Sequence, residues 1–204
     1  GLRIHQGRLW EGKPLSQLYG EAYTPWEWHA PLKAQAESLG LDFFSTPFDA
    51  SAIDYLVGLN VQALKIASFE LVDIQLISRA AESGLPLILS TGMATLGEIE
   101  DAVLTARADG KGEVALLKCV SAYPAPPEDM NLRTIPHMAS AFKVPVGLSD
   151  HTLGIESAVA SVALGACIVE KHLTLSRSQG GPDSAFSMEP DEMAGLVKAI
   201  RNVE

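Results

Sequence analysis

The segment Pro145–Asp183 reads PVGLSDHTLGIESAVASVALGACIVEKHLTLSRSQGGPD. Two short apolar runs, Val144–Leu148 and Cys167–Val169, each stop abruptly at polar residues. Between them, Gly154–Leu164 is rich in alanine and carries its apolar residues at helical spacing. A strand, a helix and a second strand of this combined length are about the minimum for a right-handed parallel crossover. The segment therefore predicts two parallel strands joined by a helix.

Each of these predicted strands is followed by a histidine, His151 in the first case and His172 in the second. Parallel α/β folds build their sites at the carboxyl ends of strands, so the two imidazoles could meet at one metal ion. Oxygen ligands or water would complete such a shell, which favours Mn²⁺ or a similar ion over structural zinc. Asp150 or Glu170 would orient the rings. The alternative is a pair of hydrogen-bonded core histidines.

The same alternation of strand and helix extends over most of the chain. The predicted strands are Leu41–Ser45, Ala63–Ala67, Leu87–Leu89, Val114–Lys118, Val144–Leu148 and Cys167–Val169. The predicted helices are Pro25–Leu39, Asp49–Leu59, Asp73–Ser83, Leu96–Ala108, Asn131–Phe142, Gly154–Leu164 and Pro190–Arg201. Residues 1–20 are predicted to be a loop with two short turns.

The strands are short and continuously apolar, which is typical of parallel strands buried on both faces. A doubly wound open sheet and a (βα)8 barrel both fit this pattern. The nucleotide-binding motifs GxGxxG and GxxxxGK[ST] are absent from the sequence, and each strand ends in its own polar group. We therefore predict an α/β protein with a TIM barrel that lacks its first one or two strands. The chain, residues 1–204, would then be a partial catalytic domain, with the missing strands before Gly1.

Composition narrows the class of function. A net charge of −10 argues against a nucleic-acid surface. No apolar run reaches the roughly 18–20 residues of a membrane span, and no secretory signal leads the chain. The two cysteines, Cys119 and Cys167, lie in apolar runs without a CxxC spacing, so we expect two buried small side chains in a reducing compartment, the cytoplasm.

Polar side chains gather at the other predicted strand ends. They are Thr46, Lys65, Ser68, Glu70, Thr91, Lys118, Ser121, Tyr123 and Ser149. A lysine inside an apolar strand is costly to bury unless an anion pairs with it. Strict alternation places Lys65 on the face opposite Ser68 and Glu70, but a twist at the strand end could bring the three together. A lysine with several hydroxyls suits a phosphate or a carboxylate; the alternative is a snorkelling lysine with capping hydroxyls.

Asp183 lies in the glycine-rich stretch QGGPDSAFS that follows the last predicted strand. A mobile loop of this kind could close over the rim and bring Asp183 to a substrate. The alternative is an Asx-turn with no functional role.

Six segments occur in order along the chain: KIASFE, LSTGMATLGEIE, YPAPPEDMNLRTIPHM, PVGLSDHT, EKHLTL and GPDSAFSMEP. Together they resemble the sialic acid synthase (N-acetylneuraminate synthase) family, over a region from about Tyr19 to Glu204. The resemblance implies condensation of phosphoenolpyruvate with an acylated amino sugar and release of phosphate. It also implies a TIM barrel followed by a small antifreeze-like domain, absent from this chain, that reaches into the partner's site in a homodimer.

Within that family, EAYTPWEW and KIASFE resemble the pseudaminic acid synthase branch, with Phe69 where the N-acetylneuraminate branch usually has glycine. The implied sugar is 2,4-diacetamido-2,4,6-trideoxy-altrose. The nearest competitors are an N-acetylneuraminate, legionaminate or spore-coat polysaccharide synthase of the same family.

The resemblance also implies roles for individual residues. His151 and His172 match the metal ligands, with Mn²⁺ preferred and Mg²⁺ or Co²⁺ as alternatives. The phosphoenolpyruvate cradle would be Thr46, Lys65, Ser68, Ser121 and Ser149, although Ser121 stands where the sialic branch has asparagine. Glu70, Tyr123 and Asp183 would face the sugar, and Glu170 would lie beside the metal. The catalytic residues would be Lys65, Glu70 and Glu170.

Two readings from other classes compete with this one. A lyase-type aldolase would use Lys65 to form a Schiff base with pyruvate, and a non-catalytic barrel would only bind a sugar. Because the family's first two strands and its final domain supply site residues, we expect the 204-residue chain alone to be inactive.

Overall fold

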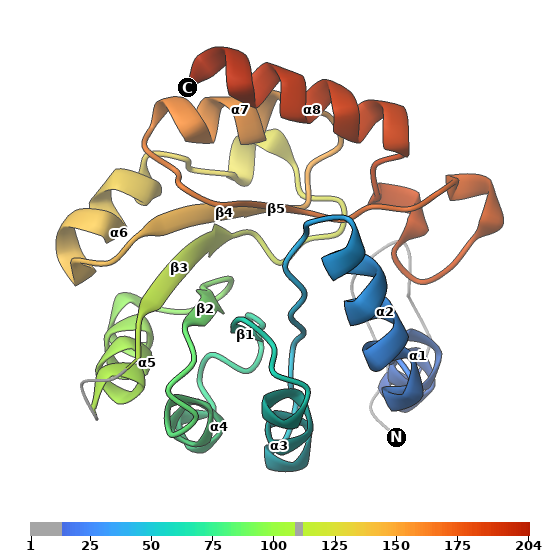
Figure 1. The fold of residues 1–204 in the computed structure, drawn as a ribbon. Helices are drawn as coiled ribbons and strands as arrows, with labels where there is room; N and C mark the ends of the chain where they lie inside the picture. Colours follow the sequence, from blue (N-terminus) through green and yellow to red (C-terminus); the bar gives the residue numbers. More distant parts are fainter. Residues whose placement is uncertain (1–13, 109–111) are drawn as a thin grey trace.

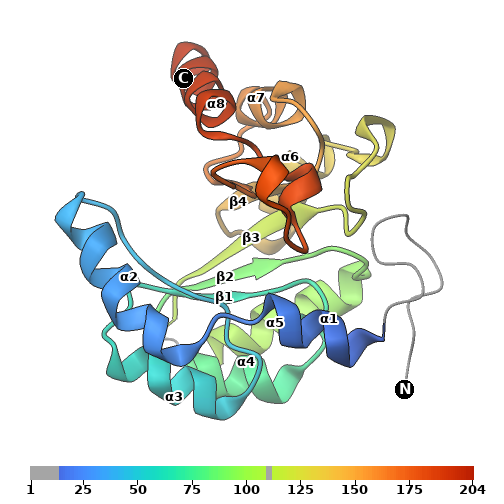
Figure 2. The same ribbon diagram turned by 90° about the vertical axis from the view of Figure 1, so that its right-hand side faces the viewer.

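The computed structural model describes residues 14–108 and 112–204. Five parallel strands form one sheet in the order β1-β2-β3-β4-β5, with each strand beside its neighbour in sequence. The sheet curves, and the helices α3 to α8 lie along its outer side (Figure 1). The result is an open, partial α/β barrel, also seen from the side in Figure 2.

The strands are β1 (Leu64–Ile66), β2 (Leu87–Ser90), β3 (Val114–Cys119), β4 (Val146–Asp150) and β5 (Val169–Lys171). The helices are α1 (Leu15–Ala22), α2 (Trp26–Ser38), α3 (Ala50–Gly58), α4 (Ile74–Ala81), α5 (Leu96–Arg107), α6 (Thr134–Phe142), α7 (Glu156–Ala163) and α8 (Pro190–Val203). Three short 3₁₀ helices complete the described chain: η1 (Pro127–Asp129), η2 (Arg177–Gln179) and η3 (Ser184–Phe186). None of the helices in the described part is long and apolar enough to cross a membrane.

Side-chain alternation divides the strands between two environments. The main hydrophobic core includes Leu64 and Ile66 of β1, Leu87 and Leu89 of β2, and Leu148 of β4. Because side chains alternate between the two faces of a strand, the residues between these point to the concave side. The parallel register then sets Cys119 opposite Ser149, and Ser149 opposite Glu170.

Local sequence signals account for where three of the helices begin. Asp49 accepts a hydrogen bond from the Ala52 amide at 2.8 Å, and Asp73 accepts one from the Leu76 amide at 3.0 Å. Thr95 forms a capping box with Glu98 at the start of α5. Each side chain satisfies an amide that the first helical turn leaves without a partner.

The structure corrects the prediction for both ends of the sheet. The predicted strand Leu41–Ser45 is reduced to one parallel bridge between Ser45 and Leu64, because no strand of the described chain pairs on its other side. β4 and β5 end two residues later than expected, so Asp150 and Lys171 belong to the strands. Their polar side chains stay in the ladder because they are paired with each other.

The structure also differs from the prediction near the N-terminus and at one cysteine. Residues 15–22 form α1 where a loop was expected, and the rest of that predicted loop, residues 1–13, lies outside the described chain. Of the two cysteines, Cys119 is buried as expected, but Cys167 is exposed. It precedes β5, whose outer side has no neighbouring strand in the described part of the chain.

Candidate functional site

A cavity of about 410 Å³ opens at the carboxyl ends of the strands. It is lined by Thr46, Phe48, Lys65, Ala67, Ser68, Phe69, Ser90, Cys119, Tyr123, Ser149, His151, Glu170, Lys171, His172 and Asp183. Every candidate site residue that we carried over from the family resemblance is in this set, except Glu70 and Ser121. The fold thus brings together side chains from positions 46 to 183 of the chain.

The two histidines lie side by side at the ends of β4 and β5, with ring centroids 5.3 Å apart. The Nδ1 atom of His151 is 3.0 Å from the carbonyl oxygen of Val120. If that nitrogen donates its proton there, Nε2 keeps a lone pair for a ligand. The Nδ1 atom of His172 is 3.7 Å from Oδ2 of Asp183.

The pKa values of the two imidazoles move in opposite directions. Burial lowers the pKa of His172, and the nearby positive charge of His151 adds to this despite the opposing charge of Asp183. Burial also opposes protonation of His151, but hydrogen bonds to Cys119 and Val120 outweigh it and raise the pKa. His172 therefore favours the neutral form that binds metals.

These residues fit a divalent cation that takes two imidazoles and completes its shell with oxygen atoms. Among the described residues, no group of three or more histidine, cysteine, aspartate or glutamate side chains is arranged to hold a metal ion. A cation here would therefore use His151 and His172 and rely on water or substrate oxygens for its other ligands.

The carboxylates expected to orient the histidine rings are engaged elsewhere. Asp150 forms a fully buried ion pair with Lys171, with Nζ and Oδ2 2.7 Å apart, and accepts a hydrogen bond from the Thr152 amide. Glu170 accepts a hydrogen bond from Ser149 at 2.6 Å. For His151, a backbone carbonyl takes the role that we had assigned to a carboxylate.

Lys65 is the buried cation of the site, with 7% of its surface exposed. Its Nζ donates to Ser90 Oγ at 2.8 Å and lies 3.7 Å from Glu170 Oε2. Burial lowers the pKa of the Lys65 ammonium, and the charge of Glu170 opposes this without cancelling it. An incoming phosphate or carboxylate would meet a buried donor that already faces an anion.

Gly92 lies where the ends of β1, β2 and β3 come close together. Its amide donates to Ser68 Oγ at 3.1 Å. A Cβ atom on Gly92 would lie 2.2 Å from Ser121 Oγ and 2.8 Å from Ser68 Oγ. The absence of a side chain is therefore what makes room for both hydroxyls.

Ser121 and Tyr123 form the next layer of the site. Ser121 does not line the cavity; it packs against Gly92, and its hydrogen bond to Tyr123 lowers the phenol pKa. Burial and the charges of Cys119 and Asp183 outweigh that bond and raise the pKa of Tyr123 to about 12. The phenol thus keeps its proton at working pH and remains a hydrogen-bond donor.

Glu70 is placed beside the cavity rather than in its lining. β1 ends at Ile66, and the chain then turns, with the Glu70 amide donating to the Ala67 carbonyl at 3.1 Å. This turn brings Ser68 to the side of Lys65 and leaves Oε2 of Glu70 buried without a hydrogen-bond partner. Burial raises the pKa of Glu70, although its own backbone amide and the charge of Lys65 oppose the shift.

Thr91 and Lys118, the remaining strand-end candidates, also do not line the cavity. Thr91 donates to the Leu117 carbonyl at 3.1 Å, and Lys118 donates to the Cys119 carbonyl at 3.0 Å. Lys118 is in register with Leu148, on the face that packs against helices, so alternation turns it away from the site.

Cys119 lines the cavity, although from the sequence we expected only a buried small side chain. Its sulfur is 3.8 Å from His151 Nδ1. Burial alone would raise the pKa of the thiol, but hydrogen bonds to His151 and Ser68 outweigh it and lower the pKa. The available signal was cross-strand: Cys119 is opposite Ser149, which was already a candidate. The other lining residues that were given no role from the sequence are Phe48, Ala67, Ser90 and Lys171.

Asp183 reaches the site from a segment that leaves the sheet after β5 and comes back beside it. The Met188 amide donates to the His172 carbonyl, and the Thr174 amide donates to the Met188 carbonyl, both at 2.9 Å. We call residues 173–188 the return loop. It also carries Phe186, whose ring centroid is 4.9 Å from that of His172 and 5.3 Å from that of Tyr123.

Comparison with known proteins assigns this arrangement to a family. The model of the NeuB family matches residues 3–204. A pseudaminic acid synthase of Helicobacter pylori is 46% identical over 198 residues, covering 97% of this chain and 58% of that protein. An N,N'-diacetyllegionaminic acid synthase of Legionella pneumophila is 43% identical over 180 residues, covering 86% of this chain and 51% of that protein.

Solved structures confirm the barrel fold. A sialic acid synthetase from Leptospira borgpetersenii, crystallised with citrate, superposes with a TM-score of 0.88 at 40% identity. The superposition covers 92% of this chain and 65% of that protein. A phospho-2-dehydro-3-deoxyheptonate aldolase from Thermotoga maritima superposes with a TM-score of 0.78 at 15% identity, a likeness of fold alone. The chain spans between about half and two thirds of the length of these relatives, from 51% of the Legionella protein to 65% of the Leptospira protein.

Proposed function

The chain belongs to the NeuB family, and on that premise we propose that this protein condenses phosphoenolpyruvate with an acylated amino sugar to a nonulosonic acid and releases phosphate. The observation that carries the proposal is the cavity itself. It combines a neighbouring histidine pair with a buried lysine that faces a glutamate. The lysine can bind phosphoryl and carboxylate groups, and a cation held by the histidine pair can polarise a carbonyl electrophile.

Phosphoenolpyruvate would bind at the buried end of the cavity. Lys65 supplies the positive charge, and the Thr46, Ser68 and Ser149 hydroxyls supply neutral donors. Ser149 and Lys65 both contact Glu170. The anionic groups of phosphoenolpyruvate would take over contacts that these two residues make with the Glu170 carboxylate. Ser121 would act from behind the lining, through Tyr123 and the space beside Gly92.

His151 and His172 would hold the divalent cation, with Mn²⁺ preferred over Mg²⁺ and Co²⁺. When bound, it would supply Lewis-acid polarisation of the sugar's aldehyde. Tyr123 donates a hydrogen bond to the sugar because its phenol keeps its proton. Asp183 faces the same space from the return loop, and Glu70 would reach the sugar from the adjacent turn.

The bond changes balance with these groups alone. The enol carbon of phosphoenolpyruvate attacks the aldehyde carbon, and the aldehyde oxygen becomes a hydroxyl. Water adds to the carbon that bears phosphate, giving one proton to Glu170, which lines the cavity between Ser149 and Lys65. Phosphate then leaves with the electron pair of its C–O bond, and that carbon becomes a ketone as its hydroxyl loses the second proton. Of the two protons of the water, one balances the new hydroxyl and the other is carried away by phosphate. Lys65 stabilises the negative charge throughout.

We propose 2,4-diacetamido-2,4,6-trideoxy-altrose as the sugar, with a full-length homodimer in the cytoplasm. Support comes from pseudaminic acid synthases of Helicobacter pylori and Campylobacter jejuni, which are similar over 97% and 98% of this chain. The Legionella legionaminic acid synthase is nearly as similar, so the choice of sugar needs a direct test.

The test is phosphate release from phosphoenolpyruvate by the full-length protein with Mn²⁺, with the altrose sugar and N-acetylmannosamine in parallel. Turnover of the altrose sugar alone supports the proposal. Turnover of N-acetylmannosamine keeps the chemistry but replaces the sugar. Borohydride trapping of a pyruvate adduct on Lys65, without metal-dependent phosphate release, would replace the proposal with an aldolase.

A further inference from the structure

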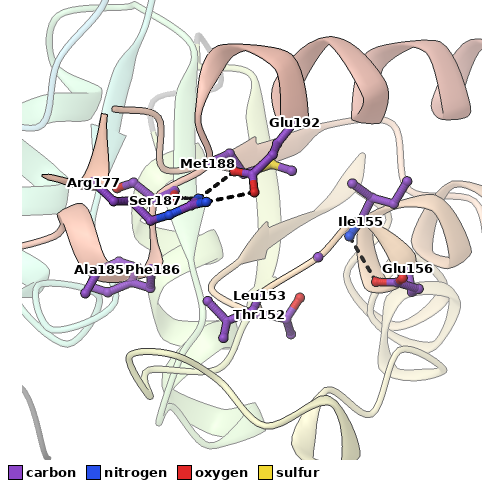
Figure 3. Close-up of a pocket in the computed structure, with 11 residues that line it drawn as sticks. Thr152, Leu153, Ile155, Glu156, Arg177, Ala185, Phe186, Ser187, Met188 and Glu192 are labelled. Carbon is purple, nitrogen blue, oxygen red and sulfur yellow. Dashed lines mark hydrogen bonds and ion pairs between the residues drawn. The ribbon is translucent and has the colours of Figure 1, made fainter. Parts of the chain in front are cut away.

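A second cavity, of about 440 Å³, lies next to the site. Figure 3 shows its lining, which includes Thr152, Leu153, Arg177, Phe186, Ser187 and Glu192. Phe186 lines this cavity, and its ring packs against His172 and Tyr123, which line the first one. Phe186 therefore forms a wall between the second cavity and the histidine side of the first.

Phe186 is almost fully buried, with 2% of its surface exposed. Its ring lies against both histidines, with centroids 4.9 Å from His172 and 6.4 Å from His151. The position of this ring relative to the histidines therefore depends on the conformation of the return loop that carries it.

Arg177 restrains this loop through hydrogen bonds and an ion pair. Its guanidinium donates to the Ser187 carbonyl at 3.0 Å and forms a two-point ion pair with Glu192 of α8, at 2.6 and 2.9 Å. Its backbone amide donates to Glu189 Oε1 at 2.8 Å. One residue in η2 thus ties both ends of the return loop to the start of α8 (Figure 3).

Further hydrogen bonds connect Ser187 to the residues that face the histidines. The Ser187 hydroxyl donates to the Asp183 carbonyl at 2.8 Å, and its amide donates to the Ser184 carbonyl at 3.2 Å. These bonds close the turn of η3, which follows Asp183 and includes Phe186. A displacement of the Ser187 carbonyl would therefore move Asp183 and Phe186 together.

We propose that Arg177 is a positioning residue of the site, which acts through Ser187 to set Phe186 and Asp183 against the histidine pair. The inference rests on the proposed function of that pair, although the geometry can be tested without it. Arg177 itself does not line the substrate cavity and acts on the site only through the return loop.

The Arg177–Glu192 pair is suited to orientation more than to stabilisation. Both side chains are partly exposed, 39% and 44%, and exposed ion pairs contribute little to folding free energy. Its hydrogen bonds with Arg177 lower the pKa of Glu192 to about 2, so the pair stays charged at any working pH. Loss of the pair should therefore change the site and leave the melting temperature nearly unchanged.

The first measurement uses the metal-free, full-length protein. Imidazole NMR signals of His151 and His172, assigned with His→Gln variants, are compared in wild type, Arg177→Gln and Arg201→Gln. Arg201→Gln is the control, because it breaks an exposed ion pair between Arg201 and Glu204 at the end of α8, far from η3 in sequence. We expect shifted His172 signals in Arg177→Gln alone. Signals that match wild type would overturn the inference, whatever the protein's function.

The second measurement is Mn²⁺ affinity, by electron paramagnetic resonance. We expect Arg177→Gln to bind Mn²⁺ roughly three- to tenfold more weakly, at the low end of effects seen for residues that orient metal ligands. The reversed pair, Arg177→Glu with Glu192→Arg, should recover part of the loss. Phe186→Leu, which alters the wall itself, should weaken Mn²⁺ binding in the same direction.

The outcomes separate the two proposals. If wild type binds no Mn²⁺ but the His172 signals shift in Arg177→Gln, the metal part of the proposed function fails and the positioning role stands. If wild type binds Mn²⁺ and Arg177→Gln binds it equally well, with unchanged His172 signals, the positioning role fails and the proposed function stands.

Discussion

The buried floor of the cavity and its outer rim are built on different principles. The floor consists of Lys65, Ser90, Ser149 and Glu170, which lie on β1, β2, β4 and β5 and form one hydrogen-bonded and ionic network. The rim consists of Phe48, Phe69 and Asp183, which lie on loops; the two phenylalanines are more than half exposed, at 59% and 55%.

On the proposed function, this difference would separate binding of the anion from recognition of the sugar. Strand register fixes the floor, so the groups proposed to meet phosphate and carboxylate are preorganised. The rim depends on loop conformation and on the ion pair of Arg177, so it can change between relatives without disturbing the sheet. The floor should therefore be shared across the family and the rim should choose the sugar.

Loss of the floor's positive charge should have the largest effect. We expect Lys65→Met to reduce kcat/KM for phosphoenolpyruvate by about 10³-fold, or about 4 kcal/mol, because the charge that stabilises the phosphate is lost. Steady-state phosphate release measures it. Lys118→Met is the matched control, because Lys118 lies on the helix-facing side of β3 and outside the cavity. Its kcat/KM should stay near that of wild type. Equal losses in both variants would contradict the floor assignment.

Filling the space at Gly92 should have the next largest effect. Gly92→Ala forces Ser68 and Ser121 apart, and overpacking of this kind costs about 1–3 kcal/mol of folding free energy. Because Ser68 lines the cavity, we expect the displacement to lower kcat/KM as well, by roughly 5- to 150-fold if the same energy is lost from the transition state. Gly97→Ala is the control because nothing lies within 4 Å of its Cβ position. Neither glycine has a positive φ, so only the contacts differ.

A second substitution sharpens that test. Adding Ser121→Ala to Gly92→Ala removes the 2.2 Å contact but leaves Ser68, so activity should recover in part. Failure to recover would show that the cost does not arise from the hydroxyls.

Truncation of a rim residue should have a smaller and more selective effect. We expect Phe69→Ala to change kcat/KM for the preferred sugar by roughly tenfold, a typical value for apolar pocket contacts, and to leave KM for phosphoenolpyruvate within about twofold. Phe44→Ala is the control, because Phe44 is also exposed but does not line the cavity. A large rise in KM for phosphoenolpyruvate would place Phe69 with the floor.

The smallest expected effect concerns Glu70, between the two regions. Burial raises its pKa above the ordinary 4.5, so the folded protein holds this proton more tightly than the unfolded chain does. The resulting stability is complete below the unfolded pKa and is lost as pH rises through the folded pKa. Because Glu70 is only half-buried, Glu70→Gln should gain less than about 1 kcal/mol over wild type on going from pH 4 to pH 7.5.

Urea unfolding of both proteins at the two pH values measures this gain. A difference that stays constant with pH would mean that the Glu70 carboxyl does not titrate differently in the folded state.

The order of strands and helices could be predicted from the sequence because each element carries its own local signal. Asp49, Asp73 and Thr95 mark helix starts, and short apolar runs mark the strands. The positions of most candidate site residues followed from one rule, that parallel strands present their carboxyl ends on the same side of a sheet. These inferences need only the neighbouring residues and the period of each element.

Other features depended on contacts between distant segments. Local apolarity favoured strands that stop at Leu148 and Val169, but the Asp150–Lys171 pair extends the ladder through Asp150 and Lys171. Strict alternation would have separated Lys65 from Ser68, and the turn after β1 joins them while it leaves Glu70 outside the lining. No local pattern predicts such an outcome, because it depends on which side chains find partners across the sheet.

The amino-acid sequence is enough to identify the elements, the family resemblance and the set of chemically useful side chains. Contacts between distant segments place Cys119 beside His151, set a backbone carbonyl against that ring, and bond Arg177 to the loop that carries Phe186. The two kinds of information differ because the forces behind them differ in range. Backbone propensity and side-chain periodicity act over a few residues, whereas register, burial and hydrogen-bond partners are set by segments that meet only in the folded chain.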